Sequence, residues 1–334
     1  MKPIKLGIIG CGIAANHLHW PALQKLRDRF QITAVCNNTR SKGKAFAKSV
    51  GGVPYLSDYR ELLKRPDVEA VDIALPIYLN YRVTKDALEA GKHVLVEKPL
   101  AVNLREAKQM MELENQHSQV KMVGENFYYH DAFRQIKNRL AQGRIGQPYA
   151  VFWDVFRKVD ENNKYAQTSW RIHHKHPGGF ITDGGVHNIA ALRVMFEDIV
   201  AGRAFTKSVN QQIGKVDTLS FQFRTSGKVY GVLNIFASAN SYFKNQFLIL
   251  GTEGSLQVVN NQELFIMKSD DWEVEKIGPD TSYQKEFEDF YQAIRTGKKV
   301  VSSFREGYRD LEIMLHALNS ANRRTHLHGL SETV

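Results

Sequence analysis

Three side chains of types that move protons stand in patterns that suggest catalysis. Lys98 closely follows the apolar run at residues 94–96, and Asp183 lies four residues before His187. A lysine ammonium at the end of a buried strand can donate to a substrate hydroxyl or carbonyl, and an imidazole titrates near neutral pH. Residues four apart in a helix share one face. We therefore predict that Lys98, Asp183 and His187 are catalytic, with the last two forming an acid–base couple. An isolated pair of this kind would be better explained as a capping aspartate and a core histidine.

A glycine-rich turn indicates which kind of ligand would bind next to these side chains. An apolar run at residues 6–9 is followed at once by Gly10-Cys11-Gly12 and then by Ala15. Glycines at these positions permit a tight turn and let the backbone approach a pyrophosphate at a helix N-terminus, and alanine is an allowed third residue. The alternative is a glycine-rich turn without a ligand. The pattern predicts a dinucleotide held by Gly10, Gly12, Ile13, Ala14 and Ala15.

The end of the second predicted strand bears on the choice of dinucleotide. An enzyme that uses NAD usually has an acidic side chain there, which holds the ribose 2′-hydroxyl. Residues 37–42 of this chain read Asn-Asn-Thr-Arg-Ser-Lys and contain no carboxylate to repel a 2′-phosphate. We therefore predict NADP rather than NAD, with contacts from Asn37, Asn38, Thr39 and Arg40. The alternative is that Arg40 and Lys42 only open a solvated helix.

The elements that must position these residues divide the chain into two predicted domains. Over residues 1–125, short apolar runs alternate with amphipathic stretches, which predicts an α/β Rossmann domain with a doubly wound parallel sheet. The predicted strands are residues 5–9, 31–36, 70–74, 93–96 and 121–123. The predicted helices are residues 18–29, 42–49, 58–64, 81–90 and 104–116.

Beyond this point the apolar period changes. Residues 150–156, 219–224, 229–235, 247–250, 255–259 and 263–267 alternate apolar and polar side chains, with Asn260-Asn261 as a turn. Residues 126–334 are therefore predicted to form an α+β domain with a large, open, mostly antiparallel sheet that binds substrate and mediates oligomerisation. Two C-terminal helices follow and are expected to pack back on the first domain. An apolar outer sheet face predicts a homodimer or homotetramer.

Composition narrows the class of protein. The chain has 334 residues, a net charge of +10 and two cysteines, with no apolar run of the length that a membrane helix needs. Reduced thiols and the lack of a signal-peptide pattern favour a cytoplasmic location. The basic charge favours an anionic small-molecule partner over nucleic acid, because no recognition motif accompanies it. Three histidines at residues 173–176 lack a convincing ligand set, so we expect no metal.

The chain resembles the glucose–fructose oxidoreductase / inositol dehydrogenase / rhizopine catabolism (Gfo/Idh/MocA) family of NAD(P)-dependent oxidoreductases. The resemblance covers nearly the whole length and rests on the glycine turn, Ala74-Leu75-Pro76, residues 90–100 with Glu97-Lys98-Pro99, Trp170-Arg171, and residues 178–187. It implies a Rossmann domain, a second mixed domain, and substrates that are sugars, cyclitols and related polyols or their keto forms. Lys98, Asp183 and His187 match the family's catalytic positions.

The resemblance also implies further site residues. For the cofactor these are Leu75, Pro76, Asn80, Glu97, Lys98, Asn126, Trp170 and Arg171, and for the substrate they are Tyr128, Tyr129 and His187. Two positions depart from the family pattern: Asn80 stands where a histidine is frequent, and Asn37 stands where an acid is usual.

These patterns predict an NADP(H)-dependent oxidoreductase that transfers a hydride between the nicotinamide and a sugar-like alcohol or ketone. Two alternatives remain at this stage. The chain could be a non-catalytic NAD(P)-binding ligand sensor of the same fold, or a reductase of a non-sugar substrate. The presence of both Lys98 and His187 favours the enzyme.

Overall fold

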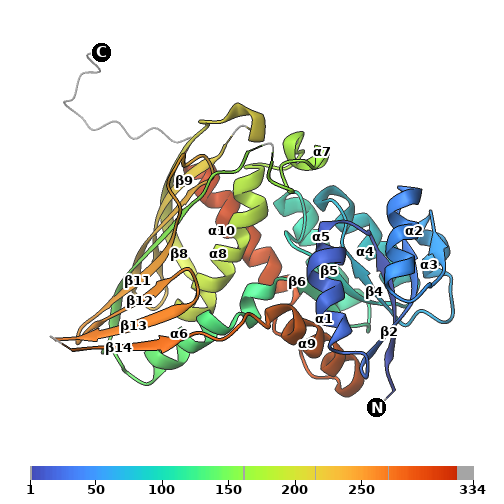
Figure 1. The fold of residues 1–334 in the computed structure, drawn as a ribbon, viewed down its shortest axis with the longest axis horizontal. Helices are drawn as coiled ribbons and strands as arrows, with labels where there is room; N and C mark the ends of the chain where they lie inside the picture. Colours follow the sequence, from blue (N-terminus) through green and yellow to red (C-terminus); the bar gives the residue numbers. More distant parts are fainter. Residues whose placement is uncertain (1, 161, 215, 270, 322–334) are drawn as a thin grey trace.

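Two sheets, each with its own helices, make up the chain (Figure 1). The computed structural model describes residues 2–160, 162–214, 216–269 and 271–321. The first sheet is parallel and has the strand order β3-β2-β1-β4-β5-β6. Its strands are β1 (Ile4–Ile9), β2 (Phe30–Cys36), β3 (Tyr55–Leu56), β4 (Ala70–Ile73), β5 (His93–Glu97) and β6 (Lys121–Gly124). The order reverses between β1 and β4, and ligands bind in such sheets at the carboxyl ends of the strands at that point.

Helices cover both faces of this sheet. One apolar core joins the sheet to α1 (Trp20–Gln24), α2 (Arg40–Ser49) and α9 (Ser282–Thr296). The opposite core includes α3 (Tyr59–Leu63), α4 (Asn80–Glu89), α5 (Leu104–Gln116) and α10 (Phe304–Ala321). Apolar side chains at helical spacing place each buried stripe against the sheet. The doubly wound parallel sheet expected from the sequence is therefore confirmed.

The second sheet has eight strands in the order β14-β13-β12-β11-β7-β10-β9-β8. The strands are β7 (Pro148–Phe156), β8 (Ile199–Lys207), β9 (Thr218–Thr225), β10 (Tyr230–Phe236), β11 (Lys244–Gly251), β12 (Ser255–Val259), β13 (Glu263–Lys268) and β14 (Asp271–Lys276). All neighbours are antiparallel except β7 and β10, which are parallel. The predicted, mostly antiparallel sheet is confirmed, and β8 and β14 are two strands that the apolar pattern did not reveal.

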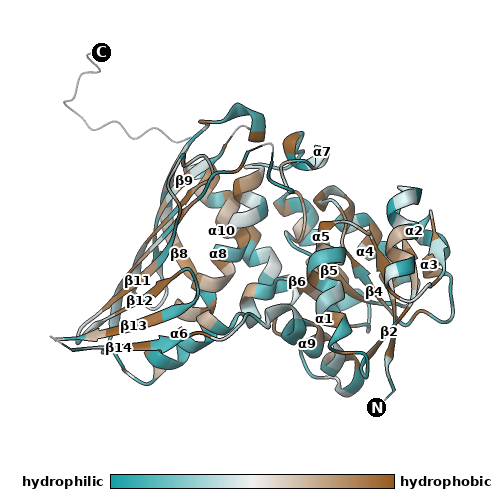
Figure 2. Cartoon of the chain, in the orientation of Figure 1, coloured by the Kyte–Doolittle hydropathy of each residue, from teal (hydrophilic) through white to brown (hydrophobic). Residues whose placement is uncertain are grey.

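In the part of the chain that the structure describes, helices pack on one face of this second sheet. In Figure 1, α8 (Phe180–Phe196), α10 and α6 (Asp131–Ala141) lie between the two sheets, and within the described residues no helix lies on the other face of the large sheet. Figure 2 shows hydrophobic residues concentrated in α8 and α10 and in the strands of the first sheet. Helix α10 contacts both α8 and α5, so it spans the boundary between the two halves. The division at residue 125 itself stays a prediction.

The segment after the glycine turn departs from the sequence expectation. Instead of one helix over residues 18–29, a π-helical turn at Ala15–His19 leads into α1, which ends at Gln24. Pro21 stands in the first turn of α1, where its missing N–H costs nothing. The wider turn holds His19 fully buried. Among the described residues, none of the helices combines the length and apolar character needed to cross a membrane.

Candidate active site

A cleft of about 1160 Å³ runs between the two halves of the chain. Its walls include the glycine turn, the carboxyl ends of β2 and β5, and the start of α8. Residues from both halves line it, including Gly12, Lys98, Asp183 and His187. The cleft therefore brings the predicted catalytic residues and the predicted dinucleotide turn to one surface.

The glycine turn fits a dinucleotide on geometric grounds. Gly10 has φ of +102°, and a Cβ there would lie 2.3 Å from the Ala74 carbonyl oxygen. A Cβ on Gly12 would meet nothing within 4 Å, so this backbone faces open space along the cleft. Ile13 and Ala14 line the cleft as well, whereas Ala15 is fully buried beneath the turn. Backbone without side chains at this point leaves room for a pyrophosphate.

The end of β2 presents a different cation to the cleft than expected. Asn37, Asn38, Thr39 and Lys42 line the cleft, but Arg40 does not. The Asn37 side-chain oxygen accepts a hydrogen bond from the Cys11 N–H at 3.0 Å, which ties this segment to the glycine turn. Arg40 is the first residue of α2 and is exposed. Lys42, two residues further along α2, is the basic side chain of this segment that lines the cleft.

Asn80 is placed to hold the turn at the end of β5 rather than to line the cleft. Its side-chain amide donates to the Glu97 carbonyl at 2.8 Å and to the Pro99 carbonyl at 3.0 Å, and the residue is fully buried. Leu75, Pro76, Glu97 and Lys98 all line the cleft beside this turn. The structure therefore gives Asn80 a supporting contact with the segment that carries Lys98.

Lys98 and Asp183 meet across the cleft. The Lys98 Nζ donates to the Asp183 carbonyl oxygen at 2.6 Å and to its Oδ1 at 3.1 Å, while Arg171 Nε donates to Oδ2 at 2.8 Å. Burial by itself would raise the pKa of Asp183, but the charges of Lys98 and Arg171 outweigh it and hold that pKa well below its usual range. Asp183 is therefore ionised at neutral pH and orients both cations.

The predicted couple between Asp183 and His187 is wrong as a direct contact. His187 Nδ1 bonds to Glu125 Oε1 at 2.5 Å, and its ring stacks on Phe127 with centroids 4.6 Å apart. The Glu125 side chain is 2% exposed and its Oε1 also accepts from the Phe127 N–H at 3.1 Å. The two residues share the start of α8, but each takes a partner from a different strand end. His187 thus has a fixed carboxylate on one nitrogen and the cleft on its other side.

Behind the cleft lies a buried group of charged side chains centred on His19. Its Nδ1 bonds to Asp72 at 2.8 Å and its Nε2 to Glu97 at 2.9 Å. Burial would lower the pKa of His19, yet the two carboxylates raise it well above its ordinary value. This imidazolium lowers the pKa of Glu97 against the effect of burial. His19 therefore neutralises part of the charge beneath the Glu97-Lys98 turn.

Glu286, on α9, lies in the same region, but its carboxyl group differs from that of Glu97 in its protonation state. It is fully buried, and neither carboxyl oxygen has a hydrogen-bond partner among the described residues. Burial, together with the nearby carboxylates of Glu97, Glu125 and Asp72, raises its pKa well above the usual value. Glu286 is therefore held as a neutral carboxylic acid at neutral pH.

Three residues that were expected to contact the cofactor or the substrate lie outside the cleft. The Tyr128 hydroxyl donates to Asp310 at 2.9 Å, and the Tyr129 hydroxyl donates to Asp289 at 2.8 Å. Asn126 donates to the Ser282 hydroxyl at 2.8 Å. None of the three lines the cleft, because the short helical turn at Asn126–Tyr129 directs their side chains toward α9 and α10. The substrate contacts expected of Tyr128 and Tyr129 and the cofactor contact expected of Asn126 therefore have no support in the geometry.

Trp170 and Arg171 do reach the cleft. Both line it, and the Arg171 guanidinium lies 4.1 Å from the centre of the Trp170 ring. They come from α7 (Ser169–Ile172), which Figure 1 shows at the edge of the second half facing the first. The predicted reach of this segment toward the cofactor side agrees with this placement.

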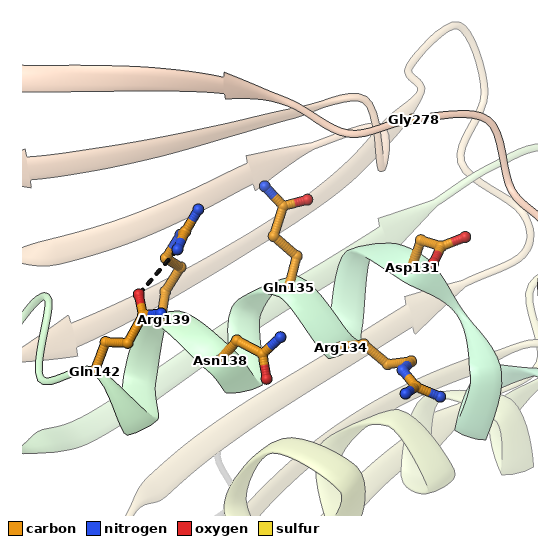
Figure 3. A pocket seen from close by; sticks show the side chains of 7 residues that line it. All are labelled: Asp131, Arg134, Gln135, Asn138, Arg139, Gln142 and Gly278. Atoms are coloured by element: carbon orange, nitrogen blue, oxygen red, sulfur yellow. Dashed lines mark hydrogen bonds between the residues drawn. The ribbon is translucent and has the colours of Figure 1, made fainter.

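A second hollow, on the outer side of α6, is unlike the cleft (Figure 3). Its volume is about 460 Å³, and most of its polar side chains are already paired. Arg139 and Gln135 both donate to Glu275, and Asp131 accepts from Thr281 at 2.7 Å. Among the described residues, no group of three or more candidate ligands is arranged to hold a metal ion. The interdomain cleft is thus the better candidate for chemistry.

Sequence reasoning missed Glu125, His19 and Arg157. Glu125 follows β6 directly, and the carboxyl end of a strand next to Lys98 is a signal that could have indicated it. His19 sits in the helical segment after the glycine turn and has no distinctive spacing. Arg157 follows β7 at the edge of the second sheet, where nothing in the sequence marks the cleft.

Known proteins resemble this chain along its length. Residues 4–125 match the model of an oxidoreductase family with an NAD-binding Rossmann fold, and residues 133–257 match a GFO/IDH/MocA C-terminal domain. The crystal structure of an oxidoreductase from Thermotoga maritima is 38% identical, covers 96% of this chain and 97% of its own, and superposes with a TM-score of 0.91.

Two curated relatives add to this picture. An uncharacterised protein of Saccharomyces cerevisiae is 31% identical over 77% of this chain and 74% of its own length. A dTDP-3,4-didehydro-2,6-dideoxy-alpha-D-glucose 3-reductase of Actinomadura kijaniata is 31% identical over 57% of this chain and 55% of its own. With its two-sheet fold, its glycine turn and its matched domains, the chain belongs to the Gfo/Idh/MocA oxidoreductase family.

Proposed function

We propose that this protein is an NADP(H)-dependent oxidoreductase that acts on a sugar, cyclitol or related polyol, or on the corresponding ketone. The observation that carries the proposal is that Lys98 and His187 both line the cleft that the glycine turn also lines. A nicotinamide, when bound, would supply or accept the hydride. The work left to this chain is to hold the substrate and to exchange its hydroxyl proton.

His187 is the proposed proton donor and acceptor. Its Nδ1 faces the Glu125 carboxylate, so the ring proton on that side is held there and Nε2 is left for the cleft. During ketone reduction His187 would give a proton to the forming alkoxide, and in the reverse direction it would take the proton back. Stacking on Phe127 fixes the plane of the ring. Glu125 would stabilise the imidazolium without touching the substrate.

Lys98 is the proposed group that polarises the substrate oxygen. Its ammonium lies between two Asp183 oxygens, so one of its three protons can point to a ligand while two stay bonded. A positive charge placed where an alkoxide develops lowers the barrier to hydride transfer. Asp183 would act by orienting Lys98 and Arg171 rather than by exchanging a proton, because the two cations keep it ionised.

The preference for NADP is supported by the side chains at the end of β2. Asn37, Asn38 and Thr39 offer hydrogen bonds without negative charge, and Lys42 adds a cation. Asp58 also lines this part of the cleft but is bonded to Arg60, which lowers its net charge toward a ligand. Cytosolic NADP pools are generally kept reduced, so we propose ketone reduction as the working direction. The name of the Actinomadura relative, a keto-sugar reductase, agrees with this direction.

We also propose that the protein works in the cytoplasm as a homodimer or homotetramer assembled through the second sheet. The uncovered face of that sheet exposes Phe152, Phe205 and Tyr230, of which Phe205 is 71% exposed. Exposed aromatic residues gathered on one sheet face are typical of an interface.

Titration of the purified protein with NADPH and with NADH tests the proposal first, with nicotinamide fluorescence as the signal. The proposal expects NADPH to bind at least about tenfold more tightly, a difference of about 1.4 kcal/mol. A screen of sugar ketones and polyols for turnover follows. Preference for NADH would refute the NADP assignment, and binding without any turnover would favour a ligand sensor.

A further inference from the structure

Arg157 is a cation of the cleft that lies beside the segment carrying Asp183 and His187, and its guanidinium has no partner among the described residues. The residue directly follows β7, and its backbone is held on both sides: its N–H donates to the Phe236 carbonyl at 2.9 Å, and its carbonyl accepts from Ala239 at 3.2 Å. The side chain lines the cleft and is exposed there. Within the part of the chain that the structure describes, no hydrogen bond or ion pair engages its guanidinium.

The guanidinium lies next to the catalytic segment. A Cβ added to Gly184 would be 3.2 Å from Arg157 Nη2, so the absence of a side chain at residue 184 makes room for the fork. Gly184 itself lines the cleft between Asp183 and His187. Arg157 is therefore at the substrate end of the cleft, near Lys98 and Asp183, and not at the end of β2 where a ribose phosphate would lie.

The charges at this end of the cleft do not cancel. Lys98 and Arg171 share the single carboxylate of Asp183, and Arg157 brings a third positive charge. The other two acids are already engaged, Glu97 with His19 and Glu125 with His187. An unpaired guanidinium in a cleft that also holds Lys98 and Arg171 gains from a bound anion, which accepts its hydrogen bonds and offsets the local positive charge.

We propose that Arg157 recognises an oxyanion on the substrate, so that the protein acts on a sugar acid or a sugar phosphate rather than on a neutral polyol. This inference rests on the proposed oxidoreductase function and narrows its substrate class. A planar guanidinium fork matches the two oxygens of a carboxylate or a phosphate and fixes the ligand's orientation. With that group held beside Gly184, a neighbouring hydroxyl or carbonyl carbon of the same molecule comes within reach of Lys98 and His187.

Binding of matched ligands to the NADPH-loaded full-length protein tests this. The probes are D-gluconate against D-glucitol, and D-glucuronate and D-glucose 6-phosphate against D-glucose, measured by nicotinamide fluorescence and by calorimetry. We expect at least one anion to bind about tenfold or more tightly than its neutral counterpart. Tighter binding of the sugar acids alone would identify a carboxylate substrate. Tighter binding of the phosphate alone would identify a sugar phosphate.

Variants assign the effect to the residue. R157Q should remove the advantage of the anion, while R157K, which keeps the charge but not the fork, should retain part of it. Lys158→Gln is the matched control, because Lys158 loses the same charge one residue away but pairs with Asp160 and does not line the cleft. K158Q should bind every probe as the wild type does.

Three results would overturn the inference. No anion binding better than its neutral partner would refute it, as would R157Q weakening acids and neutral sugars equally. Loss of NADPH affinity in R157Q would assign the guanidinium to the cofactor instead. Each of these leaves the proposed function standing if NADPH still binds to the wild type and a neutral sugar is turned over, so the two failures are distinguishable.

Discussion

Replacement of Glu125 by glutamine is the sharpest test of how His187 is prepared for proton transfer. The side chain keeps its size, but the partner of His187 Nδ1 loses its charge. In the wild type that hydrogen bond is 2.5 Å long and joins side chains that are 19% and 2% exposed. An amide can also turn its NH₂ toward Nδ1, which would leave the ring proton on the nitrogen that faces the cleft.

The size of the effect follows from the kind of bond. A hydrogen bond to a charged group contributes about 1.5–3 kcal/mol, and each 1.36 kcal/mol in the barrier changes a rate tenfold. If the bond supports the imidazolium in the transition state, E125Q lowers kcat by about 10- to 150-fold. NADPH affinity should stay within about twofold.

The assay measures steady-state turnover of the ketone that the wild type reduces fastest, and the loss of NADPH absorbance reports the rate. Glu286→Gln is the matched control: it is the same chemical change at another buried glutamate of the same region, but one already held neutral by burial and nearby carboxylates, which raise its pKa. E286Q should keep kcat within about twofold. An E125Q enzyme with unchanged kcat would refute the role given to Glu125.

Four other outcomes follow from the same structure. K98M should lower turnover by about 10²- to 10⁴-fold with NADPH binding kept, as measured by fluorescence titration, and an active K98M would remove Lys98 from the mechanism. In the wild type the raised pKa of Glu286 makes the free energy of unfolding fall by up to about 1.4 kcal/mol per pH unit above roughly pH 4.3, because the unfolded chain ionises there while the folded state stays protonated. E286Q should remove that slope and raise Tm at pH 8, and a lower Tm there would contradict the assignment. K42A should weaken NADPH about tenfold with NADH unchanged, whereas R40A should change neither by more than about twofold; equal effects would contradict the cleft geometry. F205E should shift the assembly toward monomer in light scattering, and an unchanged mass would place the interface elsewhere.

The parts of the site that the sequence could predict are those held by local backbone. The glycine turn sits between a strand and a helical segment, and its chemistry is set by residues 10–15 alone. Lys98 is likewise fixed by the strand before it, since the carboxyl ends of parallel strands meet at one edge of the sheet. The spacing of Asp183 and His187 correctly placed both at the start of one helix that lines the cleft.

Contacts between side chains that are far apart in the sequence could not be predicted from local patterns. His187 pairs with Glu125, 62 positions earlier, and Asp183 with Lys98, 85 positions earlier. Helical spacing shows only which residues share a face, not which neighbour from another element faces them. Tyr128 fails for the same reason: its position after β6 is right, but the direction of a side chain in a short helical turn depends on what packs against it, here Asp310.

The predicted cofactor contacts contain a smaller error, which also concerns the direction of a side chain. The segment at residues 37–42 was identified, but the basic residue that reaches the cleft is Lys42 and not Arg40. Helix α2 begins at Arg40, two residues earlier than expected, so Arg40 lies in the helix about 200° around its axis from Lys42. A shift of one residue turns a helical side chain by about 100°, so boundary errors matter most where single side chains recognise a ligand.

Transfer of deuterium from NADPH labelled at the reactive nicotinamide carbon tests the central proposal most directly. The purified protein is incubated with the labelled cofactor and a ketone that it consumes, and the product is analysed by mass spectrometry. The account predicts one deuterium on the new carbinol carbon in the wild type, and labelled product formed at least about 100-fold more slowly with K98M. NADPH that binds tightly but leaves every ketone unlabelled would contradict hydride transfer and identify a protein that only senses its cofactor.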